Sequence, residues 1–192
     1  MKIALISDLH SQPKTLLYLQ QIIDLEKPNA IICAGDITQG DNLDFLDNLF
    51  EVFKKSKIEA FLVWGNAEGV LSQRKILESS YNSHLCLRSS RGEKIFGIAD
   101  VSDYPIFDTS LLKDAILITH RPPLVSSLNK KMANSPKFHI SGHLHKPGFV
   151  KKYKATTHIQ VPTLQDKRYA ILDSANSSVL FCKVPMLVAN RF

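Results

Sequence analysis

The stretch KIALISDLH, residues 2–10, sets the fold that we expect for this chain. It begins with a mainly apolar run that lacks the strict alternation of a half-exposed strand, which is typical of a strand buried on both faces. Asp8 and His10 follow this run directly. The next segment, 13–27, opens with Pro13 at a helix-start position and repeats apolar residues at helical spacing. This pattern predicts a helix after the first strand.

The alternation of strand and helix continues along the first third of the chain. Strands are predicted at 29–34 and 58–64, with a helix at 42–55 between them. Such alternation predicts right-handed βαβ units and a parallel sheet covered on both faces. In sheets of this kind, functional groups collect beyond the carboxyl ends of the strands. The edge formed by these ends should hold Asp8, Asp36 and Asn66.

The second half of the chain has shorter connections between its apolar runs. Strands are predicted at 85–89, 94–100 and 115–120. After residue 137, four further runs joined by turns predict an antiparallel sheet. We therefore expect an α/β fold, a four-layer αββα sandwich of two mixed β-sheets flanked by helices. Because no linker interrupts the 192 residues, we expect a single domain over 1–192. The four late runs lie at 137–141, 149–162, 168–173 and 177–184.

The composition restricts the partners and the compartment. A net charge of +6 favours anionic partners through long-range steering. No aromatic residues interleave with a long basic stripe, so binding of nucleic acid is possible in principle but not favoured. Asp8 interrupts the first apolar run too early for a signal peptide or a membrane span, so we expect a cytoplasmic protein without membrane contact. The cysteines form no CxxC pair and lie in apolar stretches, which predicts buried free thiols at Cys33, Cys86 and Cys182.

Potential metal ligands follow several of the apolar runs, often directly after a glycine that permits close backbone approach. The set contains four imidazoles, two carboxylates and one amide oxygen. Mixed nitrogen and oxygen donors suit first-row divalent ions such as Mn, Fe, Co, Ni or Zn rather than Mg or Ca alone. Seven groups are too many for one tetrahedral ion and suit two ions that share a carboxylate. The candidate ligands are Asp8, His10, Asp36, Asn66, His120, His143 and His145.

The order of these motifs, D-x-H, GD, GN, H and GHxH over residues 8–145, resembles the calcineurin-like metallophosphoesterase superfamily. Its small bacterial and archaeal phosphodiesterases are similar in length. The resemblance implies two divalent ions, manganese in the first place and iron, nickel, cobalt or zinc as alternatives. It implies that a first ion is held by Asp8, His10 and His145, a second by Asn66, His120 and His143, and that Asp36 bridges both. It also implies phosphate-ester hydrolysis by a hydroxide held between the ions, with catalytic roles for Asp36, Asn66 and His120.

One position departs from the family pattern. Many relatives carry GNH followed by Asp or Glu, with the His near the leaving group, whereas this chain has GNAE with Ala67 at the His position. Since general-acid assistance is typically worth roughly 10²–10⁴-fold, we expect activity biased towards diesters with acidic or strained leaving groups. The expected substrate is a small phosphodiester or a nucleotide. We expect Glu68 to be exposed and ionised, and therefore a poor substitute for the missing acid.

Two further residues are candidates for substrate contact. Asn66 is one, and Arg121, which directly follows a candidate ligand, either contacts a substrate phosphate or lies in solvent. Substrate choice should depend on loops near 38–42, 66–72 and 100–110. The remaining histidines match no ligand position and are expected to be structural; they are His84, His139 and His158.

Two other functions remain open at this point. Ala67 allows a catalytically weak or inactive scaffold of the same fold that acts through protein contacts. The basic charge allows a nuclease, whose binding to oligonucleotides would weaken steeply with salt. The sequence leaves the oligomeric state open.

Overall fold

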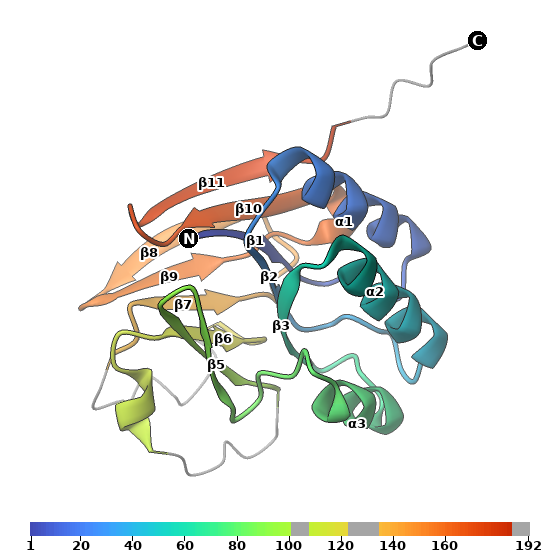
Figure 1. Ribbon diagram of the computed structural model, residues 1–192, viewed down its shortest axis with the longest axis horizontal. Helices are drawn as coiled ribbons and strands as arrows, with labels where there is room; N and C mark the ends of the chain where they lie inside the picture. Colours follow the sequence, from blue (N-terminus) through green and yellow to red (C-terminus); the bar gives the residue numbers. More distant parts are fainter. Residues whose placement is uncertain (101–107, 123–134, 186–192) are drawn as a thin grey trace.

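A computed structural model describes residues 1–100, 108–122 and 135–185, and its chain path is shown in Figure 1. The first sheet has the strand order β11-β10-β1-β2-β3. β1, β2 and β3 are parallel to one another, while β10 is antiparallel to β1 and β11 is antiparallel to β10. This sheet is therefore mixed. Its strands are β1 (Lys2–Ile6), β2 (Ala30–Ala34), β3 (Glu59–Val63), β10 (Arg168–Asp173) and β11 (Ser178–Lys183).

Three helices lie along one side of the molecule, beside the first sheet (Figure 1). α1 (Pro13–Glu26) begins with proline in its first turn, where a missing N–H costs nothing. α2 (Leu43–Ser56) begins where the Asn42 side chain accepts the N–H of Phe45 at 3.0 Å. α3 (Val70–Glu78) packs beside α2 and was not predicted, because it is short and buries only Ser72 and Ile76.

The second sheet has the order β4-β5-β6-β7-β9-β8 and differs from the prediction. β5, β6, β7 and β9 are parallel, and only the edge strands β4 and β8 are antiparallel to their neighbours. The predicted antiparallel sheet is wrong because β10 and β11 join the first sheet and the run 149–162 folds into a β8–β9 hairpin that places β9 beside β7. The strands are β4 (Leu87–Ser90), β5 (Glu93–Ile98), β6 (Ile116–Thr119), β7 (Phe138–Ser141), β8 (Phe149–Tyr153) and β9 (Thr156–Gln160).

One buried apolar cluster joins the two sheets. It contains residues of β1, β2 and β3 together with residues of β6, β7 and β9. A smaller cluster lies where the short 3₁₀ helix η1 (Thr109–Leu112) places Leu112 against Phe96, Ile98 and Leu117. A second 3₁₀ helix, η2, spans Leu164–Asp166. The α/β class with two mixed sheets flanked by helices is confirmed.

The cysteines agree only partly with the prediction of buried thiols. All three are free, and Cys33 is buried within β2. Cys86 is exposed because it precedes the edge strand β4, and Cys182 is half-buried because it lies on the edge strand β11. Burial of the latter two was therefore wrongly predicted. None of the helices among the described residues is long and apolar enough to cross a membrane.

Candidate metal centre

Parallel strands bring the predicted ligands to one edge of the structure. Asp8, Asp36 and Asn66 follow β1, β2 and β3, whose carboxyl ends share one edge of the first sheet. In the second sheet, His120 follows β6 and the His143 loop follows the neighbouring parallel strand β7. The backbone N–H of Gly142 donates to the carbonyl of His120 at 3.0 Å, which joins these two strand ends. The two edges meet at the candidate ligands.

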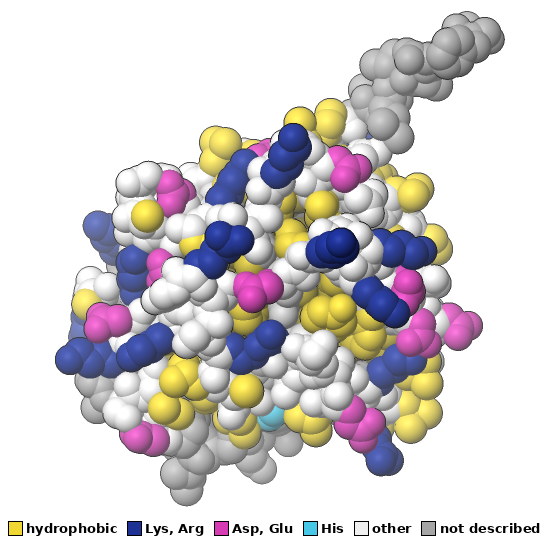
Figure 2. All heavy atoms as spheres, in the orientation of Figure 1, with side chains coloured by type: hydrophobic (Ala, Val, Ile, Leu, Met, Phe, Trp, Pro, Cys, Tyr) yellow, Lys and Arg dark blue, Asp and Glu magenta, His cyan; other side chains and the backbone are white. Residues whose placement is uncertain are grey.

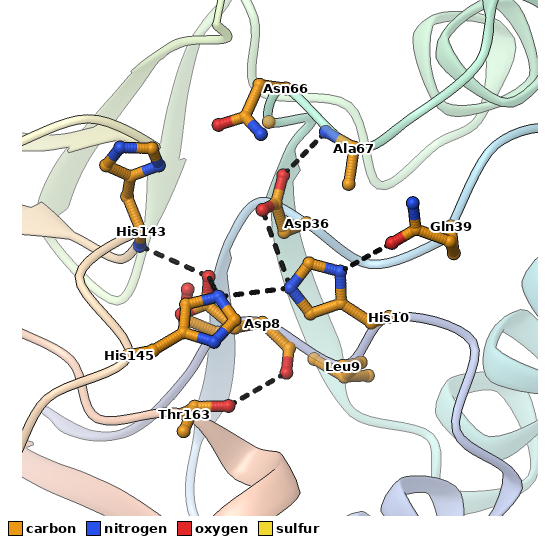
Figure 3. A network of polar contacts seen from close by, with 12 residues as sticks. Asp8, Leu9, His10, Asp36, Gln39, Asn66, Ala67, His143, His145 and Thr163 are labelled. Carbon is orange, nitrogen blue, oxygen red and sulfur yellow. Dashed lines mark hydrogen bonds and ion pairs between the residues drawn. The ribbon is translucent and has the colours of Figure 1, made fainter.

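Four of the predicted ligands form a first group, drawn in Figure 3. Each of Asp8, His10, Asp36 and His145 offers one ligand atom, and these atoms all lie within 4.8 Å of one another. Nε2 of His10 lies 3.1 Å from Nε2 of His145 and 3.6 Å from Oδ2 of Asp36. Nε2 of His145 lies 3.3 Å from Oδ1 of Asp8. Two imidazoles and two carboxylates from three chain segments therefore converge on one point.

A second group shares Asp36 with the first. Ligand atoms of Asp36, His120 and His143 lie within 4.8 Å of one another. Nε2 of His120 lies 3.3 Å from Oδ1 of Asp36 and 3.2 Å from Nδ1 of His143. The amide oxygen of Asn66 lies 3.2 Å from Nε2 of His120. One oxygen of Asp36 thus faces the first group, and the other oxygen faces the second.

Hydrogen bonds outside the two groups fix the orientation of two imidazole rings. Nδ1 of His120 lies 2.9 Å from the carbonyl oxygen of Ala34, and Nδ1 of His10 lies 3.1 Å from the amide oxygen of Gln39. Because both oxygens can only accept, each Nδ1 carries a proton, and this bond directs each Nε2 towards the centre. Gln39 was missed in the sequence, since nothing in the local pattern distinguishes it from any loop glutamine.

The buried carboxylates fit a cationic occupant. Oδ2 of Asp8 is buried and has no hydrogen-bond partner among the described residues. Burial raises the pKa of Asp8, and the nearby His120 and Ser7 only partly oppose the rise. At Asp36, burial is outweighed by hydrogen bonding to His120 and by the charge on its ring, so the pKa lies below its usual value. A buried carboxylate oxygen without a partner, on a residue that lies in a group with two imidazoles, suits a divalent first-row ion.

Left-handed backbone is concentrated at the candidate ligands. Asp8, His10, Asp36, His143 and His145 have φ of 56°, 46°, 51°, 76° and 47°. Non-glycine residues rarely adopt this conformation, and it persists only where the surrounding structure enforces it. The clustering of such residues in one place is typical of a functional site.

Two glycines permit the close approach of the loops. A Cβ on Gly142 would overlap Oγ of Ser7 and would lie 3.0 Å from the carbonyl oxygen of Ala34. A Cβ on Gly65 would overlap Oδ1 of Asp36. Any side chain at either position would push apart the strand ends that carry the ligands.

Glu68 is buried rather than exposed, so the expectation for it was wrong. Its carboxylate accepts three backbone N–H groups, from Ile37, from Thr38 at 3.2 Å and from Gly65 at 2.7 Å. Burial raises its pKa to about 7, although these donors oppose the rise. Because the donors flank Asp36 and Asn66, Glu68 joins the two loops that carry them. Neither composition nor spacing could have revealed this role, because it depends on the approach of two loops.

Arg121 lies at the rim of the second group. Its Nε donates to Oδ1 of Asp100 at 2.8 Å, and its Nη1 lies 3.5 Å from Nε2 of His143. The side chain is 35% exposed, so it is neither buried nor free in solvent. Most of the third loop expected to shape substrate choice, residues 101–107, lies outside the described residues.

The other three histidines belong to neither group and form hydrogen bonds elsewhere in the fold, in keeping with the expected structural role. Nε2 of His139 lies 2.8 Å from the hydroxyl of Thr119, and Nε2 of His158 lies 2.8 Å from the hydroxyl of Ser141. Nδ1 of His84 accepts the backbone N–H of Ala99 at 3.0 Å.

A comparison with protein-family models gives one match. Residues 1–147 match the model described as calcineurin-like phosphoesterase. A search among curated proteins found no match.

Solved structures share the fold at low sequence identity. A Thermus thermophilus protein has a TM-score of 0.74 at 15% identity, with 96% of this chain and 99% of that chain covered. An archaeal protein described as a novel phosphodiesterase has a TM-score of 0.61 at 15% identity over 95% and 99% of the two chains. A protein described as a dimetal phosphatase from Danio rerio has a TM-score of 0.62 at 11% identity over 96% and 99%.

Proposed function

The chain belongs to the calcineurin-like phosphoesterase family, and we propose that this metal-dependent phosphoester hydrolase acts as a phosphodiesterase on small diesters or nucleotides. The observation that carries the proposal is the position of Asp36 between two groups of donor atoms. A carboxylate with one oxygen towards each group suits a pair of ions that share one ligand.

The donor set supports two divalent ions. Asp8, His10 and His145, with one oxygen of Asp36, would hold the first. Asn66, His120 and His143, with the other oxygen, would hold the second. Nitrogen donors make manganese, iron, cobalt, nickel and zinc suitable, and we propose manganese for the native enzyme. Two such ions would lower the pKa of a shared water and so supply a hydroxide nucleophile near neutral pH.

The chain's own residues bind and orient the ester in this scheme. Asn66 is exposed and offers its amide N–H₂ to a phosphate oxygen while its oxygen lies towards His120. Arg121, anchored by Asp100, would place its guanidinium against a non-bridging oxygen, where negative charge increases in the transition state. Both contacts stabilise charge without transferring a proton.

Ala67 supports a diester preference. Its side chain is a methyl group, so it cannot protonate a departing alkoxide. Aryl diesters and 2′,3′-cyclic phosphates have leaving oxygens that depart with less assistance than the alkoxide of an alkyl monoester does. The archaeal protein described as a phosphodiesterase shares this fold, which is in keeping with the proposal but shows the fold alone.

The test is a substrate panel assayed with purified protein. Metal-depleted protein would be supplied with manganese and offered an aryl phosphodiester, an aryl phosphomonoester, and 2′,3′- and 3′,5′-cyclic nucleotides. We expect manganese-dependent turnover with at least one diester faster than the monoester, and its loss in Asp36→Asn. Faster turnover of the monoester would contradict the diester preference. No turnover of any substrate in the metal-loaded protein would favour the scaffold alternative.

The nuclease alternative has less support on the face seen in Figure 2. Lys and Arg side chains are spread over this face, with Asp and Glu side chains between them, and they form no continuous basic stripe there. A nuclease would require salt-dependent binding of oligonucleotides.

A further inference from the structure

A second concave site lies at the edge of the first sheet opposite the candidate metal centre. It is a cavity of about 310 Å³ beside the ends of α1 and α2 and the amino ends of β2 and β3. The metal centre lies at the carboxyl ends of the same strands. Ile23, Pro28 and Ile58 are buried or half-buried and form its apolar lining. We call this cavity the basic edge pocket.

Three cations from separate elements surround the basic edge pocket. Lys27 follows α1, Lys57 follows α2, and Arg91 lies in the turn between β4 and β5. None of the three forms an ion pair or side-chain hydrogen bond within the described ranges, whereas Lys2 pairs with Glu26 at 2.8 Å. Three positive charges around one cavity repel one another unless an anion lies between them.

The backbone holds all three cations in the same conformation. Lys27, Lys57 and Arg91 have φ of 45°, 51° and 47°, in the left-handed region. At the two lysines this conformation ends a helix, with the backbone N–H of Lys27 bonded to Ile23 and that of Lys57 to Lys54. A lysine at a helix end also compensates the helix dipole. Arg91 follows a strand, so the dipole does not account for the third cation.

Neutral donors complete the lining. The side-chain oxygen of Asn29 accepts the backbone N–H of Lys2 at 2.9 Å, which fixes the amide and leaves its N–H₂ as a donor. Ser56, which carries a hydroxyl group, also lines the cavity. A pocket lined by cations, a fixed amide N–H₂ and a serine, with no carboxylate in its lining, is suited to an oxyanion.

We propose that the basic edge pocket binds a small phosphorylated compound that carries several negative charges. Its volume is at the lower end for small-molecule sites, which run from about 300 to 1,000 Å³. That size accommodates a pyrophosphate group or a compound built on one. The pocket shares no residue with the candidate metal centre, so we expect binding in it without metal at that centre.

Isothermal titration calorimetry with inorganic pyrophosphate tests the proposal on the full, metal-depleted chain. The variants are Lys27→Asn, Lys57→Asn and Arg91→Asn, singly and combined, because asparagine tolerates left-handed backbone and removes the charge. Lys154→Asn is the matched control, since Lys154 is exposed, has φ of 54° and lies in the β8–β9 turn.

We expect submillimolar binding at about 50 mM salt, where surface charges are weakly screened. Each single variant should weaken it about fivefold, the triple variant should abolish it, and Lys154→Asn should leave it unchanged. In ¹H–¹⁵N spectra of the unmodified chain, pyrophosphate should shift the side-chain amide of Asn29, which keeps the test valid if the triple variant misfolds.

Absence of binding, or equal binding by the folded triple variant, would overturn the proposal. A third arm uses a short single-stranded oligonucleotide. Binding of the oligonucleotide alone, lost in the triple variant, would mean that the cations form a nucleic-acid surface and would also overturn it.

Discussion

The backbone N–H of Ala67 donates to Oδ1 of Asp36 at 2.9 Å, so the position of the missing histidine is tied directly to the carboxylate shared by both ligand groups. A side chain at this position therefore starts beside the reacting phosphate of the proposed mechanism. Ala67→His should supply a proton donor there and raise turnover of an alkyl monoester relative to an aryl diester. General-acid assistance sets the expected scale, roughly 10-fold or more for a group not evolved for the site. The ratio of kcat/KM values checks this, and an unchanged ratio would show that residue 67 does not face the leaving group.

The division of ligands into two groups predicts separable metal losses. His145 belongs to the first group and His143 to the second. Glycine replacements at these positions keep the left-handed backbone relaxed and remove one ring each. We expect each variant to hold one metal ion fewer per chain than the unmodified protein in elemental analysis, and both to lose most activity. Retention of both ions by His143→Gly, with activity intact, would show that this ring is not a ligand.

Glu68 should act as a positioning residue for the loops that carry Asp36 and Asn66. Glu68→Ala leaves three buried N–H groups without their acceptor, and each such group costs about 1–3 kcal/mol. We expect a lower urea midpoint and weaker manganese binding. Glu68→Gln keeps one acceptor oxygen, so its urea midpoint and manganese affinity should lie between those of Glu68→Ala and the unmodified chain. Glu78→Gln, on the exposed face of α3, is the control and should match the unmodified chain. Equal metal affinity in Glu68→Ala and the control would contradict the positioning role.

Gly142 should not accept a side chain. Gly142→Ala would force its Cβ against Oγ of Ser7 and the carbonyl of Ala34. Overpacking of this kind costs typically about 1–3 kcal/mol, and we also expect loss of bound metal because the His143 loop moves. Ser7→Ala removes the Oγ that lies closest to this Cβ, so the double variant Ser7→Ala/Gly142→Ala should recover part of the lost stability and metal content. A double variant no more stable than Gly142→Ala would place the clash elsewhere. Thermal unfolding and metal content measure both effects.

Two buried histidines predict a loss of stability in acid. Burial lowers the pKa of His139 from 6.5 to about 3 and that of His158 from 6.5 to about 4. As the pH falls, each ring binds a proton in the unfolded chain before it does so in the folded chain. The stability of the fold is therefore fully present above pH 6.5 and is lost as the pH falls towards 4. Each ring contributes a slope of up to about 1.4 kcal/mol per pH unit.

Urea titrations between pH 7 and pH 4.5 check this prediction, with His139→Gln as the comparison because glutamine does not titrate. The variant will be less stable at neutral pH, since Thr119 loses a partner. Its stability should nevertheless fall less steeply with acid. Parallel curves for the two proteins would show that His139 already binds its proton in the folded state.

The sequence predicts the residues of the candidate site better than it predicts the order of the strands in the two sheets. Asp8, Asp36 and Asn66 each follow a local strand signal, so parallel pairing alone brings them to one edge. The position of β9 between β7 and β8 has no local signature, because nothing within 149–162 specifies its neighbour in the sheet. The roles of Glu68 and Gln39 could not be predicted for a related reason. Thr38, which bonds to Glu68, and His10, which bonds to Gln39, each lie about 30 residues away along the chain, and only folding brings these loops together.

The pairing of Lys2 with Asp173 places β1 beside β10, a strand that is synthesised only after β2, β3 and the whole second sheet. β2 and β3 can join β1 soon after synthesis, but the opposite edge of β1 stays open until residues 168–173 emerge. An open strand edge is a template for incorrect pairing with other chains. Nascent chains of this protein should therefore depend on chaperones, or on rapid translation. This dependence should exceed that of a protein whose neighbouring strands follow one another in sequence.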